Sequence, residues 1–394
     1  MHPLPALDRD VLRQDWPLLL EACSPGLDNA RVVEKARGIA EPERLIALAQ
    51  RHGVVAHLYS ALAKADSEHL PATLFGTVRW ARKQQLLAAM SLTAELFRVQ
   101  QVLAESRAEF LVTKGPVLAC RAYGDLAARR YTDLDFLVRH VDILSVASQL
   151  VAAGYISHTP LSAIQDQRIP GEYIFHRPGT PSIVEVHTQR SFRYFPRPLP
   201  IEDFLQRRTS VAVDGRAVPA LSAEDEFVLI SVHGAKHFWE RLMWISDVAA
   251  MVHNCPEMDW KRVRQSAAQT GAERMVRVAL LLASRVLRAE IPAEMEREVA
   301  LDSACARIIK KIKTWLPYAG SEPPALLQRA LFRLRMRGQL LSGARYLTRL
   351  SFSTTEEDWS RDARGAAKAL RESLGRPFRL AKKYRRGSKK PARD

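Results

Sequence analysis

The segment YTDLDFLV, residues 131–138, carries two aspartates inside an apolar run. Side chains on a β-strand alternate between its two faces, so Asp133 and Asp135 would point the same way. Leu134 and Phe136 would point to the opposite face. Two carboxylates side by side repel each other, and burying them without a partner is costly. We therefore expect a cation between these two acidic side chains.

The segments around this strand predict an α/β unit. EFLVTKG (109–115) is a short apolar run that ends at a glycine, as a buried strand and its turn would, and Pro116 suits the first turn of a helix. Apolar residues recur at three- and four-residue spacing over 141–154, which predicts a helix. EYIFH and SIVEVHTQ flank RPGTP, whose Pro and Gly suit a turn between paired strands. Residues 108–190 thus alternate strand and helix and then continue with strands.

Helical patterns lie on both sides of this unit. Residues before 108 are amphipathic over long stretches, and Ser222, followed by acidic residues, marks a new helix start. Further helical patterns cover 258–290, 296–315, 324–350 and 358–382. We expect an α+β fold with a small mixed β-sheet in an α/β core, flanked by N-terminal and C-terminal helical regions. The expected divisions are 1–107 (helical), 108–215 (α/β core), 216–375 (helical) and 376–394 (basic tail).

The net charge of +16 over 394 residues leaves nucleic acid, a membrane surface or an anionic substrate open as partners. Residues 376–394 hold nine Lys/Arg against one Asp, so this tail supplies +8 of that charge. We expect it to be a solvated, partly disordered extension, with contact to RNA or lipid phosphates as the alternative. No apolar run approaches the roughly 20 residues of a membrane span, and the N-terminus lacks a secretory pattern. The four cysteines form no CxxC pair, which favours a reducing cytoplasm.

A third carboxylate, Glu185, lies centrally in the apolar segment IVEVH. If that strand lies beside YTDLDFLV, Glu185 can face the same pocket as Asp133 and Asp135. Carboxylate oxygens are the ligands that Mg²⁺ prefers, and two such ions can clamp the attacking and leaving oxygens of a nucleotidyl transfer. The alternative is that Glu185 is a surface residue of a half-exposed strand.

Taken in order, these segments are similar to the nucleotidyltransferase superfamily, whose core resembles that of DNA polymerase β. More closely, they resemble a bacterial family described as uncharacterised nucleotidyltransferase. The resemblance covers residues 100–255 and rests on a Lys-Gly turn, an Arg before the D-x-D, a Glu-x-His strand and a later His-x-x-Lys-His helix. The matching residues are Lys114, Gly115, Arg129, Asp133, Asp135, Glu185, His187, His233, Lys236, His237, Arg241, Leu242, Trp244 and Asp247.

The resemblance implies a catalytic and metal-binding role for Asp133, Asp135 and Glu185, with two Mg²⁺ ions and an NTP, ATP first among them, as substrate. The residues expected to bind the nucleotide are Lys114, Gly115, Arg129, His187, His233, Lys236, His237 and Arg241. Arg129 has a second possible role, as a counter-charge to the aspartates, and Asp247 would order Arg241 or one of the histidines.

The sequence departs from the superfamily at the turn, where Pro116 follows Gly115 and the usual serine is absent. Pro116 has no N–H, so phosphate binding would depend on the Gly115 amide, the helix N-terminus and the Lys114 ammonium. Zinc at His233 and His237 is not expected, because HGAKH lacks the Glu of HExxH.

These observations predict a Mg²⁺-dependent enzyme that moves an NMP from an NTP to the hydroxyl of an unidentified acceptor and releases pyrophosphate. The acceptor could be a small molecule, a sugar, a protein or an RNA end. Two alternatives stay open: an inactive nucleotide-binding or regulatory module on the same fold, and a basic RNA-binding protein.

Overall fold

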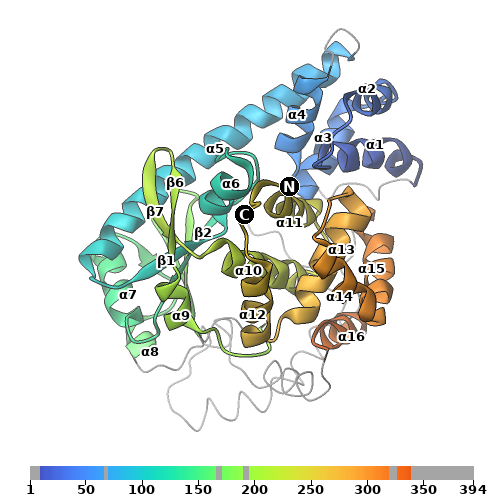
Figure 1. Cartoon of the computed structure of the whole chain (residues 1–394). Coiled ribbons are helices and arrows are strands. Elements are labelled where there is room, and N and C mark those ends of the chain that lie inside the picture. The colour runs from blue at the N-terminus through green and yellow to red at the C-terminus, as the bar shows by residue number, and fades with distance from the viewer. Residues whose placement is uncertain (1–8, 66–69, 166–170, 190–194, 319–325, 339–394) are drawn as a thin grey trace.

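A computed structural model describes residues 9–65, 70–165, 171–189, 195–318 and 326–338 (Figure 1). The helix expected over 358–382 and the basic tail expected over 376–394 lie outside the described residues. Within the described residues no helix is both long enough and apolar enough to cross a membrane.

The centre of the fold is one mixed sheet of seven strands in the order β3-β4-β5-β2-β1-β7-β6. β2 pairs in parallel with β5 and antiparallel with β1, while β1 pairs in parallel with β7. The expected mixed sheet flanked by helices is therefore confirmed. The strands are β1 Phe110–Thr113, β2 Asp133–Val138, β3 Ile156–Ser157, β4 Glu172–His176, β5 Ile183–His187, β6 Thr209–Val213 and β7 Arg216–Ala220.

The β6–β7 hairpin is an element that the helix and strand predictions missed. Its turn is Asp214-Gly215, and both residues have positive φ, 48° and 73°, as a tight two-residue hairpin turn requires. The core boundary expected at residue 215 falls inside this hairpin, and the sheet continues to Ala220.

Helices precede, interrupt and follow the sheet. The N-terminal helices are α1 Arg9–Ala22, α2 Asn29–Arg37, α3 Pro42–His52, α4 Val55–Lys64 and α5 Ala72–Glu105. Within the core lie α6 Gly115–Tyr123, α7 Ile143–Ala152, α8 Leu161–Gln165 and α9 Ile201–Gln206. The C-terminal helices are α10 Ala223–Lys236, α11 Leu242–Asn254, α12 Trp260–Thr270, α13 Glu273–Leu287, α14 Ala293–Leu301, α15 Ser303–Trp315 and α16 Leu326–Met336.

The long helix α5 joins the N-terminal helices to the sheet (Figure 1). Near its start, Leu74 and Val78 belong to the large cluster of buried side chains shared by the N- and C-terminal helices. Near its end, Leu96 and Val99 pack in a second cluster with the sheet and α7. One helix therefore contributes to both cores.

The two faces of β2 differ because its side chains alternate. Leu134 and Phe136 are fully buried in the cluster formed with α5 and α7. Leu137, on the face that also carries Asp133 and Asp135, is buried in the same cluster as Phe227 of α10. The face of the sheet that carries the aspartates is therefore covered by the C-terminal helices.

Candidate active site

Three carboxylates meet on the covered face of the sheet. β2 and β5 run in parallel with Asp135 directly opposite Glu185, so both side chains leave the same face, and Asp133 precedes Asp135 by two residues on that face. All three line one pocket of about 190 Å³. The prediction that Glu185 faces this pocket rather than open solvent therefore agrees with the geometry.

Asp135 is the best-partnered of the three. Only 2% of its side chain is exposed; its Oδ2 lies 2.7 Å from Lys114 Nζ and its Oδ1 lies 2.8 Å from His187 Nε2. Burial opposes its ionisation, but the Lys114 ammonium and the His187 hydrogen bond hold its pKa well below the usual range. The cation expected beside the aspartates is, in this structure, the Lys114 side chain.

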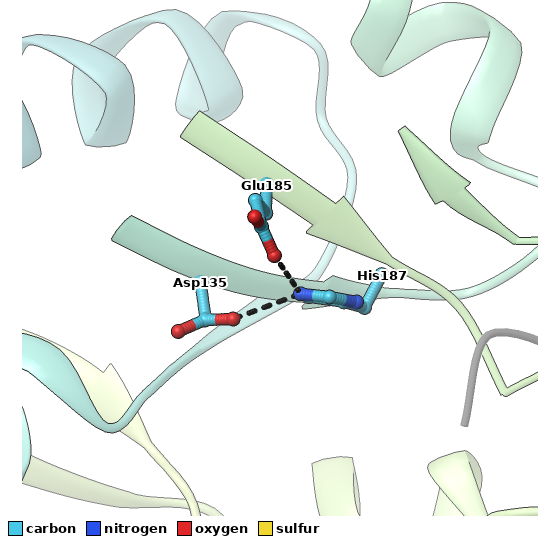
Figure 2. Close-up of side chains that lie close together, drawn as sticks. All are labelled: Asp135, Glu185 and His187. Carbon is cyan, nitrogen blue, oxygen red and sulfur yellow. Dashed lines mark hydrogen bonds and ion pairs between the residues drawn. The ribbon is translucent and has the colours of Figure 1, made fainter. Parts of the chain in front are cut away.

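His187 joins the two strands. Its Nε2 also lies 3.3 Å from Glu185 Oε2 (Figure 2). Burial lowers the pKa of this imidazole, but the hydrogen bonds with Asp135 and Glu185 outweigh burial and raise that pKa to about 9. The protonated imidazole offsets negative charge beside Asp135 and Glu185.

Asp133 is the least satisfied carboxylate. Among the described residues no hydrogen bond or ion pair to it is found, and burial together with the Asp135 charge raises its pKa. An unpartnered carboxylate beside two others is a set of oxygen donors that suits a hard divalent cation. Asp133, Asp135 and Glu185 thus offer oxygen donors of the kind expected from the sequence. Within the described residues, however, the potential ligand atoms that lie within 4.8 Å of one another belong to Asp135, Glu185 and His187, and Asp133 is not in that group.

The turn before α6 has an unusual backbone. Lys114 has φ 54° and ψ −138°, and Gly115 has φ 42°. For a residue with a Cβ, such a conformation costs on the order of 1–3 kcal/mol, and it persists only where the surroundings impose it. Gly115 opens α6, so its amide lies at the positive end of the helix dipole.

The opposite wall of the pocket comes from α10. Leu229, Val232, His233, Lys236 and His237 line it, the last of these one residue beyond the helix. Three of these five were predicted from the sequence to lie over the core. The pocket is thus bounded by carboxylates on the sheet, Lys114 at the turn, and α10.

The sequence matches a protein-family model over residues 39–288, and that family is described as uncharacterised nucleotidyltransferase. The chain belongs to this family. Among curated proteins no match was found. A crystal structure of an antigenic nucleotidyltransferase-like protein from Paracoccidioides brasiliensis is similar at 17% identity, with 52% of this chain and 95% of that chain covered and a TM-score of 0.32.

In this nucleotidyltransferase the neutral form is favoured for His233, in α10, and for His237, one residue beyond that helix. Burial, reinforced by the Lys114 charge, lowers the pKa of His233 well below its usual value, and burial with the Lys236 charge lowers that of His237 to about 3. Their rings lie 5.5 and 5.1 Å from the Trp244 ring. The group of potential metal ligands found within the described residues is Asp135, Glu185 and His187, and it does not include His233 or His237.

Three residues expected to bind nucleotide, Gly115, Arg129 and Arg241, do not line the pocket. Arg129 is 4% exposed and donates hydrogen bonds of 3.0–3.2 Å to both carboxylate oxygens of Asp247. Asp247 also accepts a hydrogen bond of 3.0 Å from the Tyr123 hydroxyl. Asp247 was expected to order Arg241 or one of the histidines, but it orders Arg129 instead. Arg241 precedes α11, with its guanidinium 5.6 Å from the Trp244 ring centre. Arg129 is therefore a counter-charge as proposed, but to Asp247.

Sequence reasoning missed four of the pocket residues: Glu172, Phe195, Leu229 and Val232. Glu172 could have been predicted from the expected pairing of the two strands that flank RPGTP. In antiparallel β4 and β5 it lies directly opposite His187 and therefore on the same face of the sheet. The sequence pattern at Leu229 and Val232 indicates only the apolar side of a helix and does not indicate a pocket. Phe195 follows a segment with no periodic pattern.

Proposed function

We propose that this nucleotidyltransferase is Mg²⁺-dependent and moves an NMP from an NTP to an acceptor hydroxyl, with release of pyrophosphate. The observation that supports this most is the convergence of Asp133, Asp135 and Glu185, from neighbouring strands, on a pocket that also contains Lys114 and Lys236. Carboxylates that hold divalent ions next to ammonium groups for phosphates are the combination that nucleotidyl transfer needs.

The three carboxylates would hold the metal, and bound Mg²⁺ would supply positive charge to the phosphate oxygens and to the attacking and leaving oxygens. The Lys114 ammonium would leave Asp135 and contact a phosphate oxygen of the NTP instead, because Lys114 lies at the end of a short strand beside the N-terminus of α6. Lys236, on the opposite wall, would contact the same triphosphate.

Glu185 would accept the proton of the acceptor hydroxyl. Its side chain is 22% exposed, against 2% for Asp135, so an acceptor hydroxyl can reach it. The hydroxyl oxygen forms a bond to the α-phosphorus, its proton passes to Glu185, and the bond from the α-phosphorus to the pyrophosphate oxygen breaks. The neutral side chains of Phe195, Leu229 and His233 would pack against the base or the acceptor.

The test is pyrophosphate release from each NTP with Mg²⁺, together with mass spectrometry of the protein and candidate acceptors for added NMP mass. We expect release by the wild type, its loss in Asp135→Asn and Glu185→Gln, and its retention in Asp28→Asn, a matched control at the N-cap of α2, where Asn caps as well as Asp. Calorimetric ATP binding without release over long incubation would instead indicate a binding or regulatory module. Equal release by wild type and Asp135→Asn would refute the proposal.

A further inference from the structure

The Lys114 backbone is held by a residue that no sequence motif indicated. The Lys114 amide donates a hydrogen bond of 2.9 Å to Glu226 Oε1, across 112 residues of sequence. Glu226 lies in the first turn of α10 and is completely buried. A buried carboxylate that accepts from a backbone amide fixes that amide in place, since breaking the bond would leave a buried charge less satisfied.

Glu226 is itself fixed from the other side. Its second carboxylate oxygen pairs with the Arg121 guanidinium on α6. Arg121 Nη2 also donates to Thr209 Oγ1 at 2.8 Å and to the Leu221 carbonyl at 2.6 Å. The carboxylate that holds the Lys114 amide is thus tied to α6, to β6 and to the segment that leads into α10.

Lys114 is therefore held at both ends. Its amide is bound by Glu226 of α10 and its ammonium by Asp135 of β2. Its φ of 54° is one that a residue with a Cβ rarely adopts, so the turn needs an external partner to keep it there. The next residue, Gly115, opens α6 with φ 42°, so the same clamp sets the direction of the first α6 amide.

We propose that Glu226 is a positioning residue that holds the Lys114–Gly115 turn in its phosphate-binding conformation. This inference rests on the proposed function, because the turn is taken to bind the triphosphate. One helix then has two tasks: its first turn fixes the turn before α6, and its last turns supply the pocket wall with His233 and Lys236.

The main test replaces the buried ion pair by apolar side chains of similar size, in Arg121→Met/Glu226→Met. Such replacement often preserves stability, and it removes the acceptor of the Lys114 amide. Glu226→Gln keeps an acceptor oxygen, whereas Glu226→Asp keeps the charge for Arg121 but shortens the reach toward Lys114. The matched control is Asp15→Leu/Arg44→Met, which removes another partly buried ion pair, between α1 and α3.

Three quantities are measured on the full chain: the Tm, hydrogen exchange of the Lys114 amide, and the Kd of ATP with Mg²⁺ by calorimetry. We expect the double Met variant to exchange the Lys114 amide about tenfold faster and to bind ATP about tenfold more weakly than the control, at a similar Tm. Glu226→Gln keeps an acceptor for the Lys114 amide but leaves Arg121 without its negative partner, so its Kd for ATP should stay within about twofold of wild type even where its Tm falls. If transfer is measurable, KM should rise in the double variant more than in the control.

An unchanged exchange rate of the Lys114 amide in the double variant would overturn the proposal, and so would faster exchange with unchanged ATP affinity. If the double variant does not fold, Glu226→Asp decides, with wild-type exchange and wild-type affinity counting against the proposal. If no form releases pyrophosphate, wild type included, the proposed transfer activity is refuted. The proposed role of Glu226 is not refuted by that result, because amide exchange and ATP binding test it independently.

Discussion

The buried pair of Arg129 and Asp247 gives the sharpest stability prediction. The exposed fractions of the two side chains are 5% and 2%, and three hydrogen bonds of 3.0–3.2 Å join them. Asp247→Asn leaves the Arg129 guanidinium buried without a negative partner. Removing one member of a buried pair costs about 3–5 kcal/mol, because the remaining charge stays desolvated. We expect the free energy of unfolding to fall by that amount.

Urea denaturation followed by circular dichroism measures this change. Two comparisons make it specific. Arg129→Met/Asp247→Leu removes both charges and should recover most of the loss. Arg31→Gln breaks the exposed pair with Asp28, whose side chains are 53% and 45% exposed, and should change stability by at most about 1 kcal/mol.

The outcome also decides between two roles for Arg129. A loss below about 1 kcal/mol from Asp247→Asn, accompanied by weaker ATP binding, would refute the structural role and return Arg129 to phosphate recognition. A large loss of stability with unchanged ATP affinity in the folded fraction is the result that we expect.

Three further predictions concern the pocket and the buried histidines. In EDTA at pH 7, Asp133→Asn should raise the Tm because it relieves repulsion with Asp135, whereas Asp135→Asn should lower the Tm because Lys114 loses its partner. Calorimetry measures both Tm values, and shifts of the same sign in the two variants would contradict the site as described. Burial lowers the pKa of His57 from 6.5 to about 4, so the free energy of unfolding should fall by on the order of 3 kcal/mol as the pH falls from 6.5 toward 4. Urea titrations at several pH values should show a smaller fall for His57→Phe, and the same dependence of stability on pH in both proteins would refute this. Because Lys114 has positive φ, Lys114→Gly should be more stable than Lys114→Ala by about 1 kcal/mol in urea, and the reverse order would contradict the strained turn.

The acidic face of the site could be predicted from the sequence because it depends on local rules. Strand alternation places Asp133 and Asp135 on one face without knowledge of any other segment. Glu185 needed one further assumption, that its strand lies beside β2, and the family pattern supplied it. The β6–β7 hairpin was also within reach, since Asp214-Gly215 between two alternating segments is a hairpin signal.

The partners of the buried charges could not be predicted in the same way. Arg129 and Asp247 are 118 residues apart, and nothing local in either segment shows that they meet. In the sequence, Glu226 is one of several acidic residues at the start of a helix. Acidic residues are common there because they interact favourably with the helix dipole, so nothing distinguishes Glu226 from its neighbours. That its carboxylate meets the Lys114 amide and Arg121 depends on where the tertiary structure places the start of α10, which no local pattern shows.

The central claim is that Asp133, Asp135 and Glu185 together hold a divalent cation in the pocket that Lys114 now shares. The most direct measurement is anomalous X-ray scattering from crystals grown with Mn²⁺ as a substitute for Mg²⁺. We predict an anomalous peak within coordination distance of all three carboxylates, with Lys114 Nζ moved off Asp135. Crystals that contain Mn²⁺ but show no peak among these carboxylates, with Lys114 still on Asp135, would contradict the claim.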